Sequence, residues 1–174
     1  MVATLTRSLG LRNVDVAEDV VQDVLVRALE VWTYRGVPEN PSAWLFQAAR
    51  NRAIDMVRRR NLDERIGRRV ALDLASPAAE VDVRDSQLRM MESCAHPGLP
   101  PEAQVTVMLK LLGGFSVPEI ARAFLTSEHA IEKRLARAKA VFRRAPNPKS
   151  PVRLESIHQA LYMLFSEGYH GSHP

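Results

Sequence analysis

The side chains of this 174-residue chain that could do chemistry are mostly basic and lie in two clusters. The first cluster falls between residues 50 and 69 and consists of Arg50, Arg52, Arg58, Arg59, Arg60, Arg65, Arg68 and Arg69. The second falls between residues 133 and 144 and consists of Lys133, Arg134, Arg137, Lys139, Arg143 and Arg144. Guanidinium and ammonium groups at this density neutralise phosphates, so both clusters favour a polyanionic partner.

The second cluster lies in a sequence typical of a helix-turn-helix. Ser116 and Glu119 have the S-x-x-E spacing of a capping box, which predicts that a short helix begins here. A longer helix from Ser127 would place Ile131 and Ala138 on its inner side at helical spacing. Its basic residues would then face outward, as on a helix that enters the major groove. The alternative is an amphipathic hairpin whose charges are simply solvated.

The first cluster ends a helix predicted over residues 40–60, with Asn40 as the cap and Pro41 in the first turn. Helical spacing separates an apolar side from a polar side that carries Gln47, Asn51, Asp55 and Arg58. Around the preceding loop, Thr33–Asn40, we expect three rings to gather: Trp32, Tyr34 and Trp44. Rings, amides and arginines together suit a single nucleic-acid strand, although each ring taken alone also suits a core position.

A helix predicted over Asp15–Trp32 has an acidic side in an otherwise basic chain. Its apolar stripe is expected to be buried and comprises Ala17, Val20, Val21, Val24, Leu25, Ala28, Leu29 and Trp32. Its outer side carries Asp19, Gln22, Asp23 and Glu30. This outer side is a candidate docking surface for a positively charged protein, and an ordinary solvated helix face is the alternative.

Helical periodicity, without sustained alternation, predicts an all-α fold. We divide the chain into a helical domain (1–60), a linker (61–85), a helix-turn-helix domain (86–145) and a C-terminal segment (146–174). In the last segment, Ser150 and Pro151 begin a helix whose apolar stripe is Leu154, Ile157, Leu161, Leu164 and Phe165. A lone helix cannot bury such a stripe, so it requires a domain of this chain, a second chain or further repeats.

Composition narrows the class of protein. The chain is 46% hydrophobic with a formal net charge of +4, which suits one or two small cores and an acidic partner. Its single cysteine, Cys94, excludes an internal disulfide, and the absence of a long apolar run or signal peptide indicates a cytoplasmic protein without a membrane partner. No glycine-rich phosphate loop, nucleophile motif or paired metal-ligand spacing is present, so we expect no enzyme, cofactor or metal.

Three stretches together resemble a known family. AEDVVQDVLVRALEVW (17–32), NPSAWLFQAARNRAIDMVRRR (40–60) and the segment from Leu99 to Arg143 are similar, in this order, to regions 2 and 4 of bacterial extracytoplasmic-function (ECF) sigma factors of the sigma-70 family. CAHPGLPPEAQ (94–104) and LYMLFSEGYHGS (161–172) further resemble a subgroup with a C-terminal helical-repeat extension, which is truncated here after one helix.

The resemblance implies a promoter-specificity subunit and not an enzyme. Its partners would be promoter DNA and core RNA polymerase, through the β′ clamp and the β subunit. The residues matching the clamp-docking element are Asp19, Gln22 and Asp23. Those matching the capture of a −10 base and the adjoining backbone are Tyr34, Gln47, Asn51, Arg58, Arg59 and Arg60. Those matching the −35 reader are Ser127, His129, Lys133, Arg134 and Arg137. The alternative is a stand-alone helix-turn-helix regulator, which would have no use for the upstream surface.

Two positions depart from the family's pattern. Leu125 stands where a glycine is usual in the turn, and a left-handed non-glycine residue there costs about 1–2 kcal/mol. Glu132 stands where a lysine is frequent, and either accepts a hydrogen bond from a cytosine or pairs with an arginine along the helix. In the subgroup the extension replaces a separate anti-sigma factor, so the expected regulatory partner is an anti-sigma factor or the chain's own extension.

Overall fold

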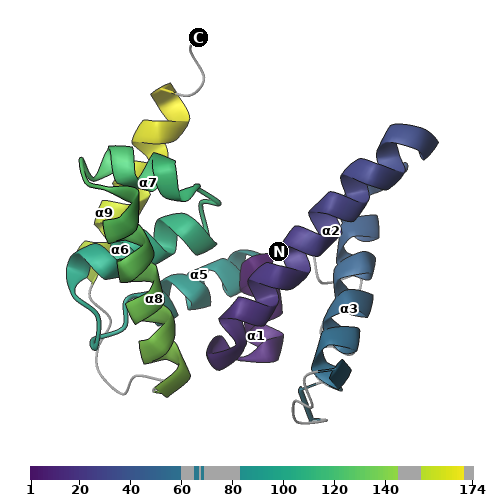
Figure 1. The fold of residues 1–174 in the computed structure, drawn as a ribbon, viewed down its shortest axis with the longest axis horizontal. Helices are drawn as coiled ribbons and strands as arrows, with labels where there is room; N and C mark the ends of the chain where they lie inside the picture. Colours follow the sequence, from purple (N-terminus) through teal and green to yellow (C-terminus); the bar gives the residue numbers. More distant parts are fainter. Residues whose placement is uncertain (60–64, 67, 69–82, 145–153, 171–174) are drawn as a thin grey trace. The chain divides into compact units, whose positions relative to one another are not determined.

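The structure is a computed structural model that describes residues 1–59, 65–66, 68, 83–144 and 154–170, and its regular elements there are all helical (Figure 1). It forms two compact units, Met1–Ser86 and Gln87–Pro174, which are described separately below. The predicted all-α fold is confirmed for these residues. Arg60, most of the predicted linker and the predicted helix start at Ser150 and Pro151 lie outside the described residues.

The first unit is built on two long helices. A short helix, α1 (Val2–Leu9), ends at Gly10 and leads through a 3₁₀ turn, η1 (Leu11–Asn13), into α2 (Val14–Arg35). The chain then returns along α2 as α3 (Pro41–Arg59), and α2 packs against both α1 and α3. The core between them is made of Leu5, Leu9, Val16, Ala17, Val20, Val24, Ala49, Ala53, Met56 and Val57. The stripe predicted for residues 15–32 contributes Ala17, Val20 and Val24 to this set.

Helix α2 differs from its prediction in length and in the width of its buried stripe. It continues to Arg35, where Gly36 ends it with φ +78° and donates its N–H to Trp32 O at 3.0 Å. Tyr34 therefore belongs to the last helical turn and not to the loop. Leu25 is 46% exposed and Leu29 is 71% exposed, so their predicted burial was wrong. Only the narrower side of α2 that carries Val20 and Val24 contacts the core.

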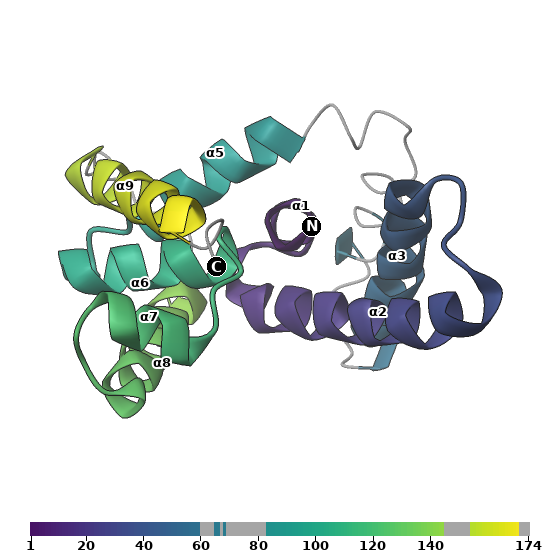
Figure 2. The same cartoon turned by 90° about the horizontal axis from the view of Figure 1, so that it is seen from above.

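The second unit surrounds one buried helix. Its elements are α5 (Val83–Cys94, which begins before Gln87), α6 (Pro101–Leu111), α7 (Val117–Ala123), α8 (Glu128–Arg144) and α9 (Leu154–His170) (Figure 2). Helix α6 is packed by α7, α8 and α9, and nearly all its residues are buried. The buried Gln104 amide donates to His96 O and Leu99 O, both at 2.9 Å, which fastens the preceding turn to α6. Burial also raises the pKa of the Cys94 thiol, so this cysteine is a neutral core residue. Leu88, on α5, is exposed.

The helix-turn-helix forms as predicted. Ser116 N and Ser116 Oγ donate to Glu119 Oε2 at 2.7 and 2.6 Å, and the Glu119 N–H donates to Ser116 Oγ, which completes the capping box. The turn contains Leu125 at φ +49°, so the predicted left-handed leucine is confirmed. Its side chain is 95% exposed, so the path of the backbone through the turn, and not side-chain packing, determines the conformation of this residue. Helix α8 buries Ile131, Leu135, Ala138 and Phe142.

Helix α9 packs back onto α6 in the same unit, which is one of the three arrangements considered for it. Ser156 and Ala160 are buried and Leu164 is half-buried, whereas Leu154, Leu161 and Phe165 of the predicted stripe are exposed. The contact depends on a close approach at Gly113. A Cβ there would lie 2.5 Å from Leu164 Cδ2 and 2.8 Å from Leu109 O, so a larger residue would require the Leu164 side chain and the local backbone to shift.

Candidate polymerase and nucleic-acid interfaces

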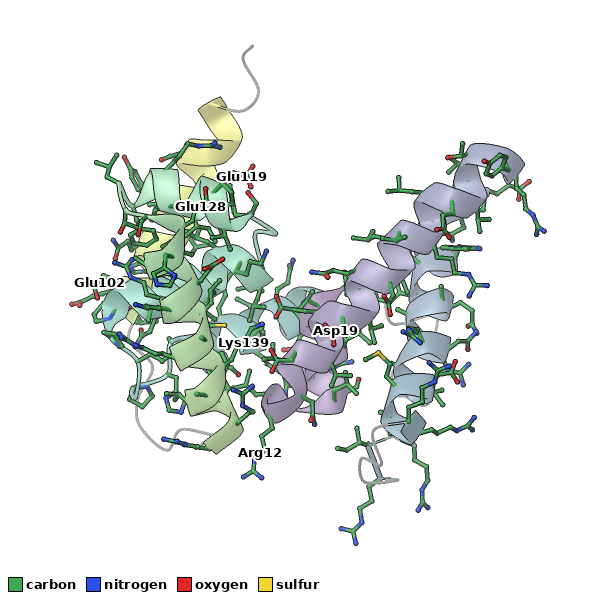
Figure 3. All side chains as sticks on the ribbon, viewed as in Figure 1. Arg12, Asp19, Glu102, Glu119, Glu128 and Lys139 are labelled. Atoms are coloured by element: carbon green, nitrogen blue, oxygen red, sulfur yellow. The ribbon has the colours of Figure 1, made fainter. Side chains whose placement is uncertain are left out.

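The exposed side of α2 combines acidic and apolar residues. Of the three predicted docking residues, Gln22 and Asp23 are exposed and Asp19 is half-buried (Figure 3). Beside them lie the exposed side chains of Leu25, Val26 and Leu29, of which the sequence analysis had placed Leu25 and Leu29 in the buried stripe. We call the six residues Asp19, Gln22, Asp23, Leu25, Val26 and Leu29 the α2 outer face. Because large apolar groups are costly in water, this face has the character of a protein contact that combines apolar and acidic groups.

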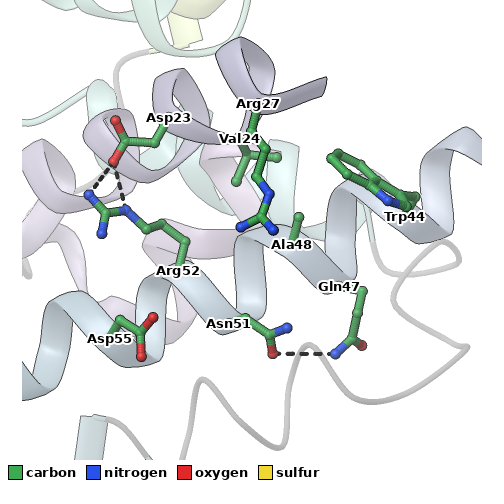
Figure 4. Close-up of a pocket in the computed structure, with 9 residues that line it drawn as sticks. All are labelled: Asp23, Val24, Arg27, Trp44, Gln47, Ala48, Asn51, Arg52 and Asp55. Carbon is green, nitrogen blue, oxygen red and sulfur yellow. Dashed lines mark hydrogen bonds and ion pairs between the residues drawn. The ribbon is translucent and has the colours of Figure 1, made fainter. Parts of the chain in front are cut away.

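A pocket opens between α2 and α3 in the first unit. Its volume is about 490 Å³, and it is lined by Asp23, Val24, Arg27, Trp44, Gln47, Ala48, Asn51, Arg52 and Asp55 (Figure 4). The structure thus brings Gln47 and Asn51 together as predicted, and Gln47 Nε2 donates to Asn51 Oδ1 at 3.3 Å. Arg58 and Arg59 are exposed in the last turn of α3. Amides and an indole beside guanidinium groups can hold a nucleobase by hydrogen bonding and stacking.

One ion pair joins the two helices across this pocket. Arg52 Nη2 lies 2.6 Å from Asp23 Oδ2, and Arg52 Nε donates to the same oxygen at 2.7 Å. Asp23, predicted from the sequence as a docking residue, therefore also belongs to the pocket. The two residues are 29 positions apart, and nothing in their local patterns indicated the pair.

The expected ring cluster is partly formed. Trp32 and Trp44 meet edge to face, with centroids 5.5 Å apart and planes at 63°. Tyr34 is 90% exposed and is not part of this ring pair. Both tryptophans are half-buried and pack on each other, which favours the core interpretation for Trp32, whereas Trp44 also lines the pocket. Tyr34 presents an open ring face on which a base could stack.

Helix α8 presents most of its predicted contact residues to solvent. The Ala130 N–H donates to Ser127 Oγ at 3.3 Å, so Ser127 caps the helix. His129, Lys133 and Arg137 are exposed, whereas Arg134 is half-buried. Glu132 Oε2 lies 3.6 Å from His129 Nδ1, a contact that neither of the two alternatives drawn for Glu132 from the sequence included. Lys139 lies further along the same helix (Figure 3).

Two further observations concern metal binding and membrane crossing. Among the described residues, no three histidine, cysteine or acidic side chains are grouped as metal ligands would be. None of the described helices combines the length and the apolar character that a bilayer crossing requires.

The capped first helix, the tight turn and the basic second helix place this all-α chain in the class of helix-turn-helix proteins. Comparison with family models makes this class specific: Sigma-70 region 2 matches residues 1–62, and ECF sigma factor matches residues 34–147. The second match covers more than half of the chain. The chain therefore belongs to the ECF sigma factor family, and the resemblance drawn from the sequence is confirmed.

Curated relatives agree with this assignment. The chain is 37% identical over 173 residues to the uncharacterized protein R00370 of Rhizobium meliloti, and the match covers 91% of this chain but 41% of that protein. It is 30% identical over 150 residues to the RNA polymerase sigma factor CnrH of Cupriavidus metallidurans. It is 28% identical over 145 residues to the RNA polymerase sigma factor NccH of Alcaligenes xylosoxydans xylosoxydans. These two matches each cover 79% of this chain and 76% of the relative. The chain thus spans less than half the length of the Rhizobium protein, and no solved structure matches it.

Proposed function

We propose that this chain is a promoter-specificity factor that binds core RNA polymerase and directs initiation at promoters with −10 and −35 elements. The observation that carries the proposal is that the first unit combines an exposed apolar and acidic face on α2 with a base-sized pocket between α2 and α3. A stand-alone regulator would use the helix-turn-helix and leave both features without a role.

Each surface has a part in this proposal. The α2 outer face contacts the β′ clamp, with the apolar residues as the centre of the contact. The pocket, lined in part by Gln47 and Asn51, receives an unpaired −10 base, and Tyr34 in the last turn of α2 offers a stacking surface outside it. Arg58, Arg59 and Arg60 hold the strand by its phosphates. The −35 element is contacted by α8 through Ser127, His129, Lys133, Arg134 and Arg137. The protein acts in the cytoplasm, together with the polymerase.

The regulatory partner is an anti-sigma factor or the segment that α9 begins. The packing of α9 on α6 supports the second choice, because it anchors this segment on the unit that carries the helix-turn-helix. A regulator attached there would act on promoter recognition without a separate protein.

Copurification with core RNA polymerase tests the proposal. Asp19→Lys combined with Gln22→Lys, and separately Leu29→Asp, should reduce the recovered complex at least tenfold, because each removes complementary contacts from the α2 outer face. Glu92→Lys, a charge reversal on exposed α5, is the matched control and should bind as the parent does. Asp23 is left intact, because its substitution also breaks the pair with Arg52. Equal recovery of all variants, or no complex with the parent chain, would contradict the docking role.

A further inference from the structure

The pocket between α2 and α3 is balanced in charge, which limits what it can hold. It is lined by two guanidinium groups, Arg27 and Arg52, and by two carboxylates, Asp23 and Asp55. A phosphate is attracted by an excess of positive charge, and this pocket has none. A nucleobase is neutral and carries donors and acceptors on its edges, so it matches the mixture of amides and charged groups better.

Arg52 is oriented inside this pocket by Asp23. Both hydrogen bonds to Asp23 Oδ2 use the Nε and Nη2 side of the guanidinium. Nη1 points away from Asp23, and it has no hydrogen-bond partner among the residues that the structure describes (Figure 4). Nη1 and the second hydrogen of Nη2 therefore form a pair of parallel donors available to a ligand.

Two parallel donors distinguish among bases. Guanine presents O6 and N7 as adjacent acceptors, and unpaired cytosine presents O2 and N3. Adenine and thymine alternate donors with acceptors along the same edges, so they satisfy one of the two donors. We infer that Arg52 is a specificity-determining residue that selects guanine or cytosine as the unpaired base in this pocket, and that Asp23 is its positioning residue. The inference rests on the proposed function.

The ion pair serves orientation more than stability. The Arg52 and Asp23 side chains are 34% and 47% exposed, and an ion pair that exposed contributes little to folding. Substitutions at either position should therefore leave the helical unit folded, which thermal unfolding of each variant will check. A change in base preference then reports on recognition and not on collapse of the unit.

The test is initiation by core RNA polymerase with the full chain on a library of promoters randomised across the −10 element. The parent should prefer guanine or cytosine at one position. Arg52→Lys keeps the charge but loses the paired donors, so it should still initiate while this preference falls about tenfold. Arg52→Ala should lose the preference entirely. Asp23→Ala should reduce the preference at the same position, and Asp23→Glu, which restores an acceptor for Arg52, should recover it in part. Arg12→Lys, the same exchange at an exposed arginine of η1, is the matched control.

The outcomes separate this inference from the proposed function. Selective initiation by the parent with an unchanged base profile in Arg52→Lys and Arg52→Ala would overturn the inference and leave the proposed function standing. The same holds if the parent prefers adenine or thymine at every −10 position. No initiation by the parent chain with core polymerase would overturn both.

Discussion

The guanidinium carbon of Arg134 lies 5.3 Å from the centroid of the Phe124 ring, so the second helix of the helix-turn-helix is tied to the end of the first by a cation–π contact. Arg134 Nη1 is buried and makes no hydrogen bond within the described residues. Arg134 is therefore half-buried in a contact within the protein, whereas Arg137, about one turn further along α8, is exposed. The two arginines should therefore contribute differently to DNA binding.

Replacing Arg134 by Ala should lower the affinity for all −35 sequences to a similar extent, because it loosens the angle between α7 and α8, and should destabilise the unit by about 1 kcal/mol. Replacing Arg137 by Ala should relax preference at one or two −35 positions, because that exposed side chain can reach base edges. Holoenzyme binding to a panel of −35 variants, with thermal unfolding, checks both. A sequence-selective loss in Arg134→Ala would show that this residue reads a base directly.

Gly113→Ala should detach or displace α9. The new Cβ would meet Leu164 Cδ2, the Phe115 ring and the backbone oxygen of Leu109, and overpacking of this kind costs about 1–3 kcal/mol. Gly114→Ala is the control, because that glycine has φ +73° but a Cβ added to it would meet no atom within 4 Å. The control should lose about 1 kcal/mol from backbone strain and keep α9 protected from proteolysis. Equal protection of α9 in both variants would argue against the close approach.

The capping box should make the start of α7 sensitive to acid. Hydrogen bonds from the Ser116 hydroxyl and then from its backbone N–H lower the pKa of Glu119. The stabilising contribution is therefore complete above the ordinary carboxyl pKa and is lost as the pH falls through the lowered folded pKa. Ser116→Ala should cost about 1 kcal/mol near neutral pH and move the Glu119 pKa back upward, as measured by carboxyl titration in NMR. An unchanged Glu119 titration in this variant would refute the assignment; Ser42→Ala, an exposed serine of α3, is the control.

Asn51→Ala should slow open-complex formation on a duplex promoter by an amount equivalent to about 1–3 kcal/mol, because a base in the pocket would lose its amide partner. On a promoter that is already unpaired at −10, part of the loss should remain, since base contacts persist after melting. Permanganate footprinting measures the first effect and equilibrium binding the second. Wild-type kinetics and affinity on both templates would remove Asn51 from the site.

The helices and most of the core could be predicted from the sequence, because helical spacing, the Asn40 and Ser116 caps and the turn residues all act locally. The width of the buried stripe on α2 could not be read from apolar composition alone. At about 100° per residue, Leu25 and Leu29 lie roughly 100° and 140° around the helix from Val24. Only tertiary packing decides which part of so wide a stripe is covered, and in α2 those two leucines remain outside.

The sequence predicted the part of the candidate site that lies on α3, but it did not predict which residues of α2 and α3 pair with each other. Gln47 and Asn51 share one side of α3 at a spacing of four, so their proximity follows from the helix itself. The pair of Asp23 with Arg52 depends on how α2 and α3 are aligned, which the sequence of either helix leaves open. Arg134 is a similar case. The sequence pattern predicts an exposed cation at this position, but the fold places its guanidinium over the Phe124 ring.

Initiation by purified core RNA polymerase tests the central claim most directly. Core enzyme alone and core enzyme with the full chain would be compared on a library of double-stranded promoters, with the transcript starts mapped. The account predicts that the chain makes initiation selective, with two sequence elements enriched upstream of the starts, and that Asn51→Ala weakens the downstream element while Arg137→Ala weakens the upstream one. A transcript profile indistinguishable from that of core enzyme alone would contradict it.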